Sequence, residues 1–292
     1  MEYVQVKKIS AFNLYIAFPS LMKSKIIRYD INGKLHNVEK IMLIQRTFLQ
    51  KITILPILPM SLNLNSQIPH SSTNEYQCLA NLNLYDSPEC VRLVTQAATG
   101  RHLQITSNHE NKAVEVCLCE DDYPGWLSRE DLRFIQETQT LYQPQLVLAT
   151  EIQQRIPDII AFTQAAKEQD NYYLWGGTVA PNYDCSGFMQ AAFKSVGVWL
   201  PRDAYQQEAF TQIVDITDLK LGDLIFFGTS KKATHVGLYL GNGYYIHSSG
   251  KDQGRNGIGI DQLSEQGDKV SQCYYQQLRG AGRVIKSYGG HG

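Results

Sequence analysis

Short runs of alternating hydrophobic and polar residues fill the chain between residues 75 and 135. The runs YQCLANLNLYD, VRLVTQ, HLQITS and AVEVCLCE follow a period of two and are separated by turn-forming pairs. They predict five short strands, which is typical of a small barrel. The segment closes on DDYPGWLSREDL, where Tyr123 and Trp126 flank a predicted Pro-Gly turn. This aromatic pair either caps the barrel core or contacts a ligand.

The pattern changes to helical spacing after about residue 150. The run IPDIIAFTQAAKEQ and the run from Cys185 to Val196 each carry an apolar stripe, and the strand-like runs DLIFFG, HVGLYLG and GYYIHSSG follow. Helices followed by consecutive hairpin strands predict an α+β domain with an antiparallel sheet. We expect this second domain to span residues 151–292. Residues 136–150, rich in Gln and Thr, read as a linker.

Residues 1–59 show neither pattern. Two lysines precede ISAFNLYIAFPSLM as in a signal peptide, but no small-residue cleavage site follows. The run IMLIQRTFLQKITILPILPM contains charges and prolines and is too polar for a spanning helix. We therefore treat residues 1–59 as an extension without an assigned fold. One hypothesis is that translation begins at Met60, and a natural peptide from residues 1–59 would contradict it.

Composition narrows the class of protein. The 292 residues suffice for two small domains, and 43% of them are hydrophobic. With 27 basic and 28 acidic residues, no overall field favours nucleic acid or an anionic membrane as a partner. The six cysteines form no repeated CxxC pair, so a structural zinc site is not expected. Cys117 and Cys119 read as packed strand thiols, which favours a reducing compartment and hence the cytoplasm.

Cys185 is placed in the first turn of a predicted helix. Asp184 or Tyr183 stands at the cap position before it, and Gly197 is placed to end the helix. The helix dipole and the free N–H groups favour an anion there, so the thiol pKa should fall and the same groups should hold an oxyanion. The alternative is a buried thiol at the top of the apolar stripe.

Two histidines favour the interpretation of Cys185 as a nucleophile. A three-residue turn at 241–243 would place His235 opposite Ser249 and set His247 on the same face of the hairpin, whereas a two-residue turn would separate the two rings. His235 would then take the thiol proton, and His247 would orient the first ring. A zinc site formed by these two histidines and Cys185 is the competing interpretation.

Ordered motifs in the second domain resemble the NlpC/P60 family of papain-like cysteine peptidases over about residues 155–285. The resemblance implies Cys185 as nucleophile, His235 as base, His247 as third member of the triad and Tyr173 as a hydroxyl donor near the oxyanion, with no metal and no organic cofactor. Residues 75–135 resemble a bacterial SH3 domain on LNLYDSPE and GWL. The expected architecture is an SH3-like β-barrel followed by a papain-like domain with helices packed on an antiparallel sheet. The motifs are YLWGG (173–177), DCSGF (184–188), LPRDAYQQ (200–207), LGDLIFF (221–227), HVGLYLG (235–241) and YIHSSG (245–250).

The same resemblance implies a substrate class. This domain pair is similar to γ-D-glutamyl-L-diamino acid endopeptidases, which cut bacterial cell-wall stem peptides, some only when the L-Ala amino group is free. Such a specificity suits the recycling of released muropeptides. Recognition of the ammonium needs nearby acceptors, and the candidates are Asp184, Ser248 and Tyr123, with the acidic residues 120–122 beside them. Asp184 as a pure helix cap is the alternative.

Two other functions fit the same residues. An amidase or acyltransferase would use the same Cys-His-His triad on another amide or ester. A wall-binding module with a decayed catalytic domain is the non-enzymatic reading, although binding alone would not require all three triad residues.

Overall fold

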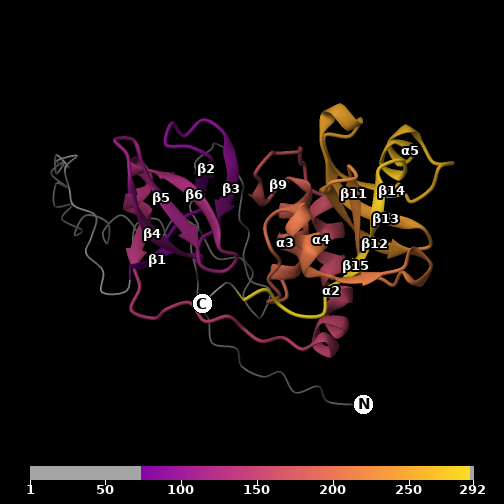
Figure 1. The fold of residues 1–292 in the computed structure, drawn as a ribbon, viewed down its shortest axis with the longest axis horizontal. Helices are drawn as coiled ribbons and strands as arrows, with labels where there is room; N and C mark the ends of the chain where they lie inside the picture. The colour runs from indigo at the N-terminus through magenta and orange to yellow at the C-terminus, as the bar shows by residue number, and fades with distance from the viewer. Residues whose placement is uncertain (1–73, 290–292) are drawn as a thin grey trace, which may run out of the picture. The chain divides into compact units, whose positions relative to one another are not determined.

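The computed structural model describes residues 74–289, so the predicted extension 1–59 lies outside the described residues (Figure 1). The first part, residues 74–137, is a seven-stranded antiparallel sheet whose strand order is β3-β2-β6-β5-β4-β1-β7, and we call it the barrel. Its apolar positions meet in a single core that includes Leu84, Leu103 and Leu127. The elements are β1 (Glu75–Cys78), β2 (Leu82–Tyr85), β3 (Leu93–Ala97), β4 (His102–His109), β5 (Ala113–Leu118), β6 (Tyr123–Ser128), the 3-10 helix η1 (Arg129–Phe134) and β7 (Ile135–Glu137).

The barrel has two strands more than the alternation predicts. The expected Pro-Gly turn at Tyr123 is instead the beginning of β6, which pairs with β5 along its whole length. Pro124 is tolerated because β6 pairs with β2 only from Trp126 onward, so the missing N–H lies outside that ladder. β7 pairs with β1 and takes the first two residues of the predicted linker.

The second domain consists of helices packed on a six-stranded antiparallel sheet with the strand order β10-β15-β11-β12-β13-β14, which confirms the predicted α+β class. Its first helix begins at Ala149, just inside the predicted linker. Within residues 74–289, no helix is both long and apolar enough to cross a bilayer. The elements are α2 (Ala149–Lys167), β8 (Thr178–Val179), β9 (Asn182–Tyr183), α3 (Cys185–Lys194), α4 (Ala204–Phe210), β10 (Gln212–Val214), η2 (Ile216–Asp218), β11 (Leu224–Gly228), β12 (Ala233–Gly241), β13 (Tyr244–Ser249), η3 (Lys251–Gln253), β14 (Gly257–Gln262), α5 (Lys269–Tyr275) and β15 (Leu278–Arg283).

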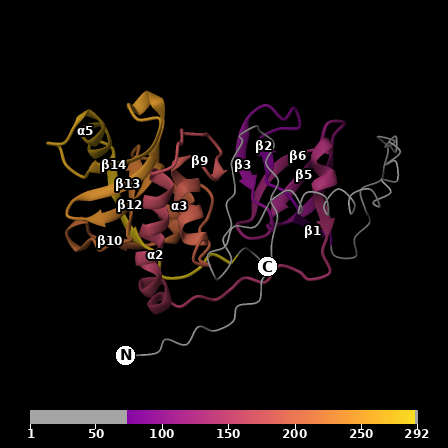
Figure 2. The ribbon, with the colours of Figure 1, turned by 180° about the vertical axis from the view of Figure 1, so that it is seen from behind.

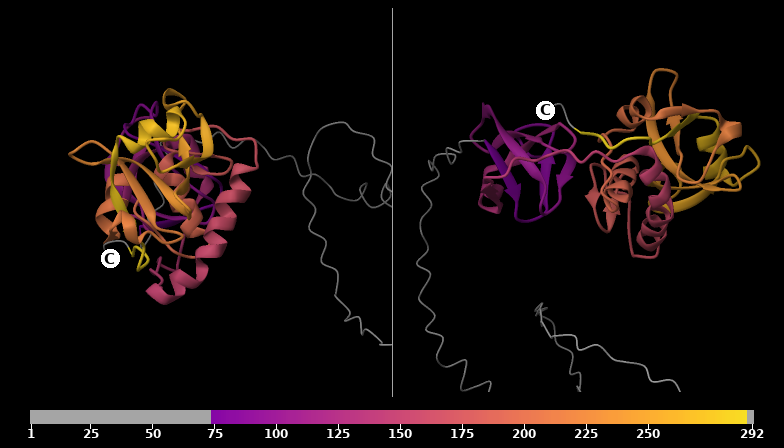
Figure 3. Two further views of the ribbon diagram at one scale, coloured as in Figure 1. Left: turned by 90° about the vertical axis from the view of Figure 1, so that its right-hand side faces the viewer. Right: turned by 90° about the horizontal axis from the view of Figure 1, so that it is seen from below.

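Helices cover both faces of this sheet. On one face, α2, α3 and α4 pack on the even-numbered apolar residues of the central strands, such as Val236 and Ile246. On the other face, α5 packs on Phe227 and Tyr245 through Tyr274. Figures 1 and 2 show α3 and α5 on opposite sides of the strands, and Figure 3 shows α2 along the outside of the domain. Each large apolar side chain buried this way contributes about 1.5–3 kcal/mol.

The β12–β13 hairpin has the predicted register but not the predicted turn. Leu238 pairs with Ile246, which is the alignment that a three-residue turn would give. The turn itself contains two residues, Asn242 and Gly243, and both have a positive φ. A bulge at Leu240 supplies the extra residue. The bulge therefore keeps both histidines on one face of the hairpin.

Candidate active site

Helix α3 begins at Cys185, and its first turn is held by local and distant contacts. Asp184 is the N-cap, and its carboxylate accepts a hydrogen bond from the N–H of Gly187 at 2.7 Å. Residue 187 must be glycine, because a Cβ there would lie 2.1 Å from the carbonyl oxygen of Gly177. Gly197, with φ +79°, lies just beyond the C-terminal end of the helix. The sequence prediction of the cap and the terminator is confirmed.

The two histidines form a buried hydrogen-bonded chain that ends on a carboxylate. Nε2 of His235 lies 2.7 Å from Nδ1 of His247, and Nε2 of His247 lies 2.6 Å from Oδ2 of Asp261 in β14. His247 is fully buried, and His235 stacks on Tyr274 of α5 with ring centroids 4.3 Å apart. Arg255 donates from Nε to Oδ2 of Asp261 at 2.7 Å. The chain leaves Nδ1 of His235 as that ring's remaining nitrogen.

The thiol of Cys185 lies against the backbone on either side of His235. Its Sγ is 3.9 Å from the carbonyl oxygen of Thr234 and accepts the N–H of Val236. These groups belong to the part of β12 that precedes its pairing with β13, which runs from Leu238 to Gly241. The sulfur therefore stands at the free edge of β12, next to the histidine.

The expected fall in the thiol pKa is wrong. Burial raises the pKa of Cys185 to about 12, and the neighbouring Asp184 carboxylate adds to the rise. The N–H groups of Val236 and Ser186 and the charge of Arg202 oppose this rise without overcoming it. Burial also holds the pKa of His235 well below its ordinary value, as does the adjacent His247 ring. The resting pair is thus a neutral thiol beside a neutral imidazole.

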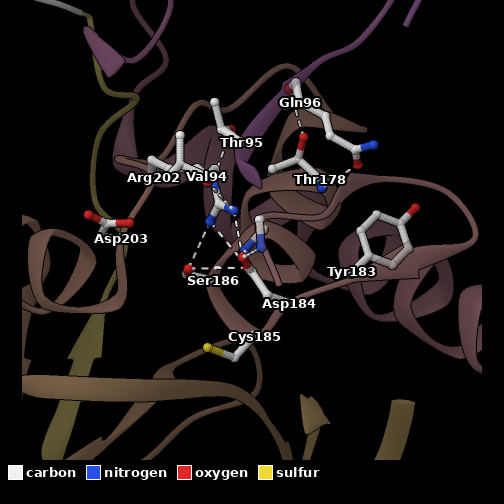
Figure 4. Close-up of polar contacts among 12 residues, drawn as sticks. Val94, Thr95, Gln96, Thr178, Tyr183, Asp184, Cys185, Ser186, Arg202 and Asp203 are labelled. Carbon is white, nitrogen blue, oxygen red and sulfur yellow. Dashed lines mark hydrogen bonds and ion pairs between the residues drawn. The ribbon is translucent and has the colours of Figure 1, made fainter. Parts of the chain in front are cut away.

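A buried arginine joins the barrel to the helix that carries Cys185. Nη2 of Arg202 lies 2.5 Å from Oδ2 of Asp184, and Nη1 donates to the hydroxyl of Ser186 at 3.0 Å. The other side of the guanidinium bonds β3 of the barrel, with Nε 2.9 Å from Oγ1 of Thr95 and Nη2 3.2 Å from the carbonyl oxygen of Val94. Figure 4 shows Arg202 between these two groups of residues. A barrel strand thus helps to fix the residue that precedes the nucleophile.

A pocket of about 290 Å³ opens above the thiol and is lined by both parts of the protein. Beside Cys185 it contains Tyr173, whose pKa is raised by burial and by its proximity to the cysteine. At another wall stand Asp203 and the barrel residue Tyr123, with the phenol donating to Oδ1 of Asp203 at 3.3 Å. Burial raises the pKa of Asp203, while Arg202 opposes that rise.

The three predicted substrate-binding residues have different positions: two of them border the pocket and the third does not. Tyr123 lines the pocket. Asp184 also borders it, but its carboxylate accepts bonds from Arg202, Gly187 and the N–H of Gly176. Ser248 is fully buried and donates to the carbonyl oxygen of Tyr183 at 2.7 Å, away from the pocket lining.

Sequence reasoning missed Arg202, Asp203 and Asp261. The first two lie in the motif LPRDAYQQ, which signalled importance without indicating roles. Asp261 carried no signal, because β14 was not recognised as a strand and its pairing with His247 was therefore out of reach. Among residues 74–289, no group of three His, Cys, Asp or Glu side chains is arranged to hold a metal ion. All six cysteines are free thiols.

A thiol at a helix N-terminus, next to a histidine oriented by a second polar side chain, is the arrangement of enzymes with a cysteine nucleophile. Comparison with known proteins specifies the family. Residues 170–278 match the NlpC/P60 family, and residues 84–132 match the bacterial dipeptidyl-peptidase SH3 domain. The chain therefore contains an NlpC/P60 domain preceded by a bacterial SH3 domain, as the motifs predicted.

Individual relatives match over shorter stretches. The chain is 46% identical over 79 residues to the γ-D-glutamyl-L-lysine dipeptidyl-peptidase of Bacillus subtilis (strain 168), covering 26% of this chain and 27% of that protein. It is 34% identical over 105 residues to a murein DD-endopeptidase/LD-carboxypeptidase of Escherichia coli (strain K12), covering 36% and 53%. It thus spans roughly a quarter to a half of these relatives. A solved NlpC/P60 family protein from Bacillus cereus ATCC 10987 is similar at 24% identity and a TM-score of 0.38, over 73% of this chain and 64% of that one.

Proposed function

We propose that this protein is a cysteine peptidase that hydrolyses the bond between D-γ-glutamate and the following diamino acid in cell-wall stem peptides. The observation that carries the proposal is the Cys185 thiol at the base of a pocket, beside the hydrogen-bonded chain from His235 to Asp261. The name of the Bacillus subtilis relative supports the choice of bond.

The chemistry follows from the neutral resting pair. As the Cys185 sulfur attacks the γ-carbonyl carbon, Nδ1 of His235 takes the thiol proton. The N–H groups at the start of α3 and the hydroxyl of Tyr173 stabilise the oxyanion. When the C–N bond breaks, His235 returns the proton to the leaving amine and a thioester remains. Water, deprotonated by the same histidine, then releases the glutamyl product and restores the thiol.

The position of Asp203 in the pocket favours a peptide with a free amino terminus. Asp184 is neutralised by Arg202, so the ammonium acceptor expected there is instead assigned to Asp203. Arg92 and Lys232 also line the pocket, so the site has no net negative charge, but the Asp203 carboxylate forms no ion pair among residues 74–289 and accepts a hydrogen bond from Tyr123. An ammonium group placed between Asp203 and the Tyr123 hydroxyl would pair with this carboxylate. Tyr123, from the barrel, thereby limits how many residues fit ahead of the scissile bond.

The same specificity bears on where the protein acts. A peptide with a free L-Ala amino group has already been detached from the glycan, so its cleavage belongs to recycling. We infer a cytoplasmic location, supported by six cysteines that are all free thiols. Fractionation of the native cells tests this location, and recovery of the protein outside the cytoplasm would contradict it.

The decisive experiment is product analysis by mass spectrometry on L-Ala-γ-D-Glu-diaminopimelate, its lysine counterpart and their N-acetylated forms. We expect release of L-Ala-D-Glu from the free peptides and a large loss of kcat/KM after acetylation. Cys185→Ala should abolish cleavage, and Asp203→Asn should weaken cleavage of the free peptide far more than that of the acetylated one. Equal rates on free and acetylated peptides would contradict the ammonium site, and cleavage at another bond would contradict the proposed activity.

A further inference from the structure

We propose that Asp261, held by Arg255, is a positioning residue that sets the tautomers of both histidines and so leaves Nδ1 of His235 unprotonated toward Cys185. This inference rests on the proposed role of Cys185 as a nucleophile. It extends the predicted Cys-His-His set by a carboxylate that lies two rings away from the thiol.

The proton positions follow from the order of donors and acceptors along the chain. Asp261 accepts bonds from Arg255 and is buried, at 3% exposure. Its ionised carboxylate is an acceptor only, so Nε2 of His247, 2.6 Å away, must carry the proton of that ring. Nδ1 of a neutral His247 is then an acceptor, and Nε2 of His235 must donate to it across 2.7 Å. A neutral His235 thereby keeps Nδ1 free to take the thiol proton.

The carboxylate is kept ionised by its surroundings. Although burial pushes the pKa of Asp261 upward, hydrogen bonds from His247 and Arg255 outweigh it and bring the pKa to about 2. Two further carboxylates lie near this cluster: Asp268, the N-cap of α5, is 3.6 Å from Arg255, and Asp252 lies near Tyr274. Tyr245 and Tyr274 pack against His247, and both stay neutral because burial raises their pKa values. The negative end of the chain is therefore fixed at Asp261.

The backbone of β14 is shaped to admit Arg255. Gly259 is the register partner of His247, and a Cβ at this position would lie 2.5 Å from Cδ and 2.7 Å from Nε of Arg255. The glycine thus leaves room for the arginine to cross β14 and reach Asp261. The run RNGIGID, residues 255–261, contains both members of the ion pair and the glycine that lets them meet.

During catalysis the same order of donors and acceptors stabilises the imidazolium form of His235. When Nδ1 of His235 takes the thiol proton, the ring donates through Nε2 to His247, which donates through Nε2 to Asp261. No second proton transfer is needed, and the positive ring faces two aligned hydrogen bonds that end on a negative charge. An asparagine at 261 can instead donate to His247, which would reverse both tautomers.

The test reads the tautomers directly by 15N NMR of the histidine rings, using the full chain without substrate. In the wild-type protein we expect protons on Nε2 of both His247 and His235, and in Asp261→Asn a loss of that pattern. The matched control is Asp223→Asn, which breaks an equally buried pair, with Arg283 at 2.8 Å, away from the histidines. This control should keep both wild-type tautomers.

Reactivity provides a second readout that needs no peptide. The rate of Cys185 alkylation by iodoacetamide, followed by mass spectrometry of its tryptic peptide, should fall about 100-fold in Asp261→Asn at neutral pH, because the general base is lost. Its acid limb should move to lower pH, because the removed carboxylate had raised the pKa of His235. A merely structural role would lower the active fraction without moving the limb.

A wild-type His247 that carries its proton on Nδ1 would overturn the proposal, and this measurement does not depend on any variant folding. So would an Asp261→Asn protein with unchanged tautomers and an unchanged alkylation rate. If tautomers and alkylation behave as expected but no stem peptide is cleaved, the positioning role stands and the proposed substrate class fails.

Discussion

Arg202 and Asp184 form a buried ion pair, 2.5 Å from Nη2 to Oδ2, immediately beside the nucleophile. Asp184 is the cap of α3 and directly precedes Cys185, and its charge raises the thiol pKa. Arg202 opposes this effect. The pair therefore links the stability of the helix start to the reactivity of the sulfur.

Replacing Arg202 should affect both the stability of the helix start and the reactivity of the Cys185 sulfur. We expect Arg202→Met to lower the unfolding free energy by about 3–5 kcal/mol, because it leaves the Asp184 carboxylate buried without a counter-charge. It should also lower kcat by raising the thiol pKa further. Denaturant unfolding and steady-state kinetics measure the two effects. Arg279→Met is the control, since its partly exposed pair with Glu208 should contribute about 1 kcal/mol or less; equal losses in the two variants would contradict the argument.

The barrel should influence catalysis through the hydroxyl of Thr95, which holds Arg202. Thr95→Val removes the acceptor 2.9 Å from Nε of Arg202 while conserving shape, and we expect it to cost about 1–3 kcal/mol. The loosened guanidinium should also lower kcat. Thr163→Val is the control, because its hydroxyl bonds only Ile160 within α2, so it should change stability and leave kcat unaltered. A Thr95→Val enzyme with wild-type kcat would show that the bond from Arg202 to Thr95 has no catalytic influence.

Activity should persist into moderately acid solution. Burial and the adjacent His247 hold the pKa of His235 well below 6.5, and a base is competent above its own pKa. The acid limb of kcat/KM should therefore fall below pH 6.5. The unfolding free energy should decline over the same range, because the unfolded histidines protonate first. A pH–rate profile checks the first point, and an acid limb above pH 6.5 would contradict the neutral pair.

Gly187 gives a test of the helix start. In an ordinary helix interior, Gly→Ala stabilises by about 1 kcal/mol. At this position the new Cβ would lie 2.1 Å from the carbonyl oxygen of Gly177, so α3 or the segment before it must move. We expect Gly187→Ala to destabilise by about 1–3 kcal/mol and to reduce activity by displacing Cys185. Thermal unfolding measures the sign, and a gain in stability would refute the close approach.

The register of the β12–β13 hairpin could be predicted from sequence, but its bulge could not. The register of β12 and β13 was predictable because Val236, Leu238 and Ile246 must share the buried face. The compensating bulge at Leu240 was not, since a bulge changes the turn length without changing the apolar pattern.

The residues that complete the site could not be predicted from the local sequence pattern. A buried arginine such as Arg202 has the same sequence appearance as an exposed one, and its acceptor Thr95 is 107 positions away. The lowered thiol pKa was expected from the helix dipole alone, whereas the structure adds burial and the Asp184 charge, which outweigh it. Contacts between residues far apart in the sequence, and the effect of burial on pKa values, are thus the two features that sequence reasoning could not supply.

The bonds from Val94 and Thr95 to Arg202 have a consequence for modularity. In this protein, grafting a different barrel onto the peptidase half would remove acceptors from a guanidinium that has no access to water. A functional chimera would therefore have to keep strand β3 of the barrel together with Arg202 of the peptidase domain.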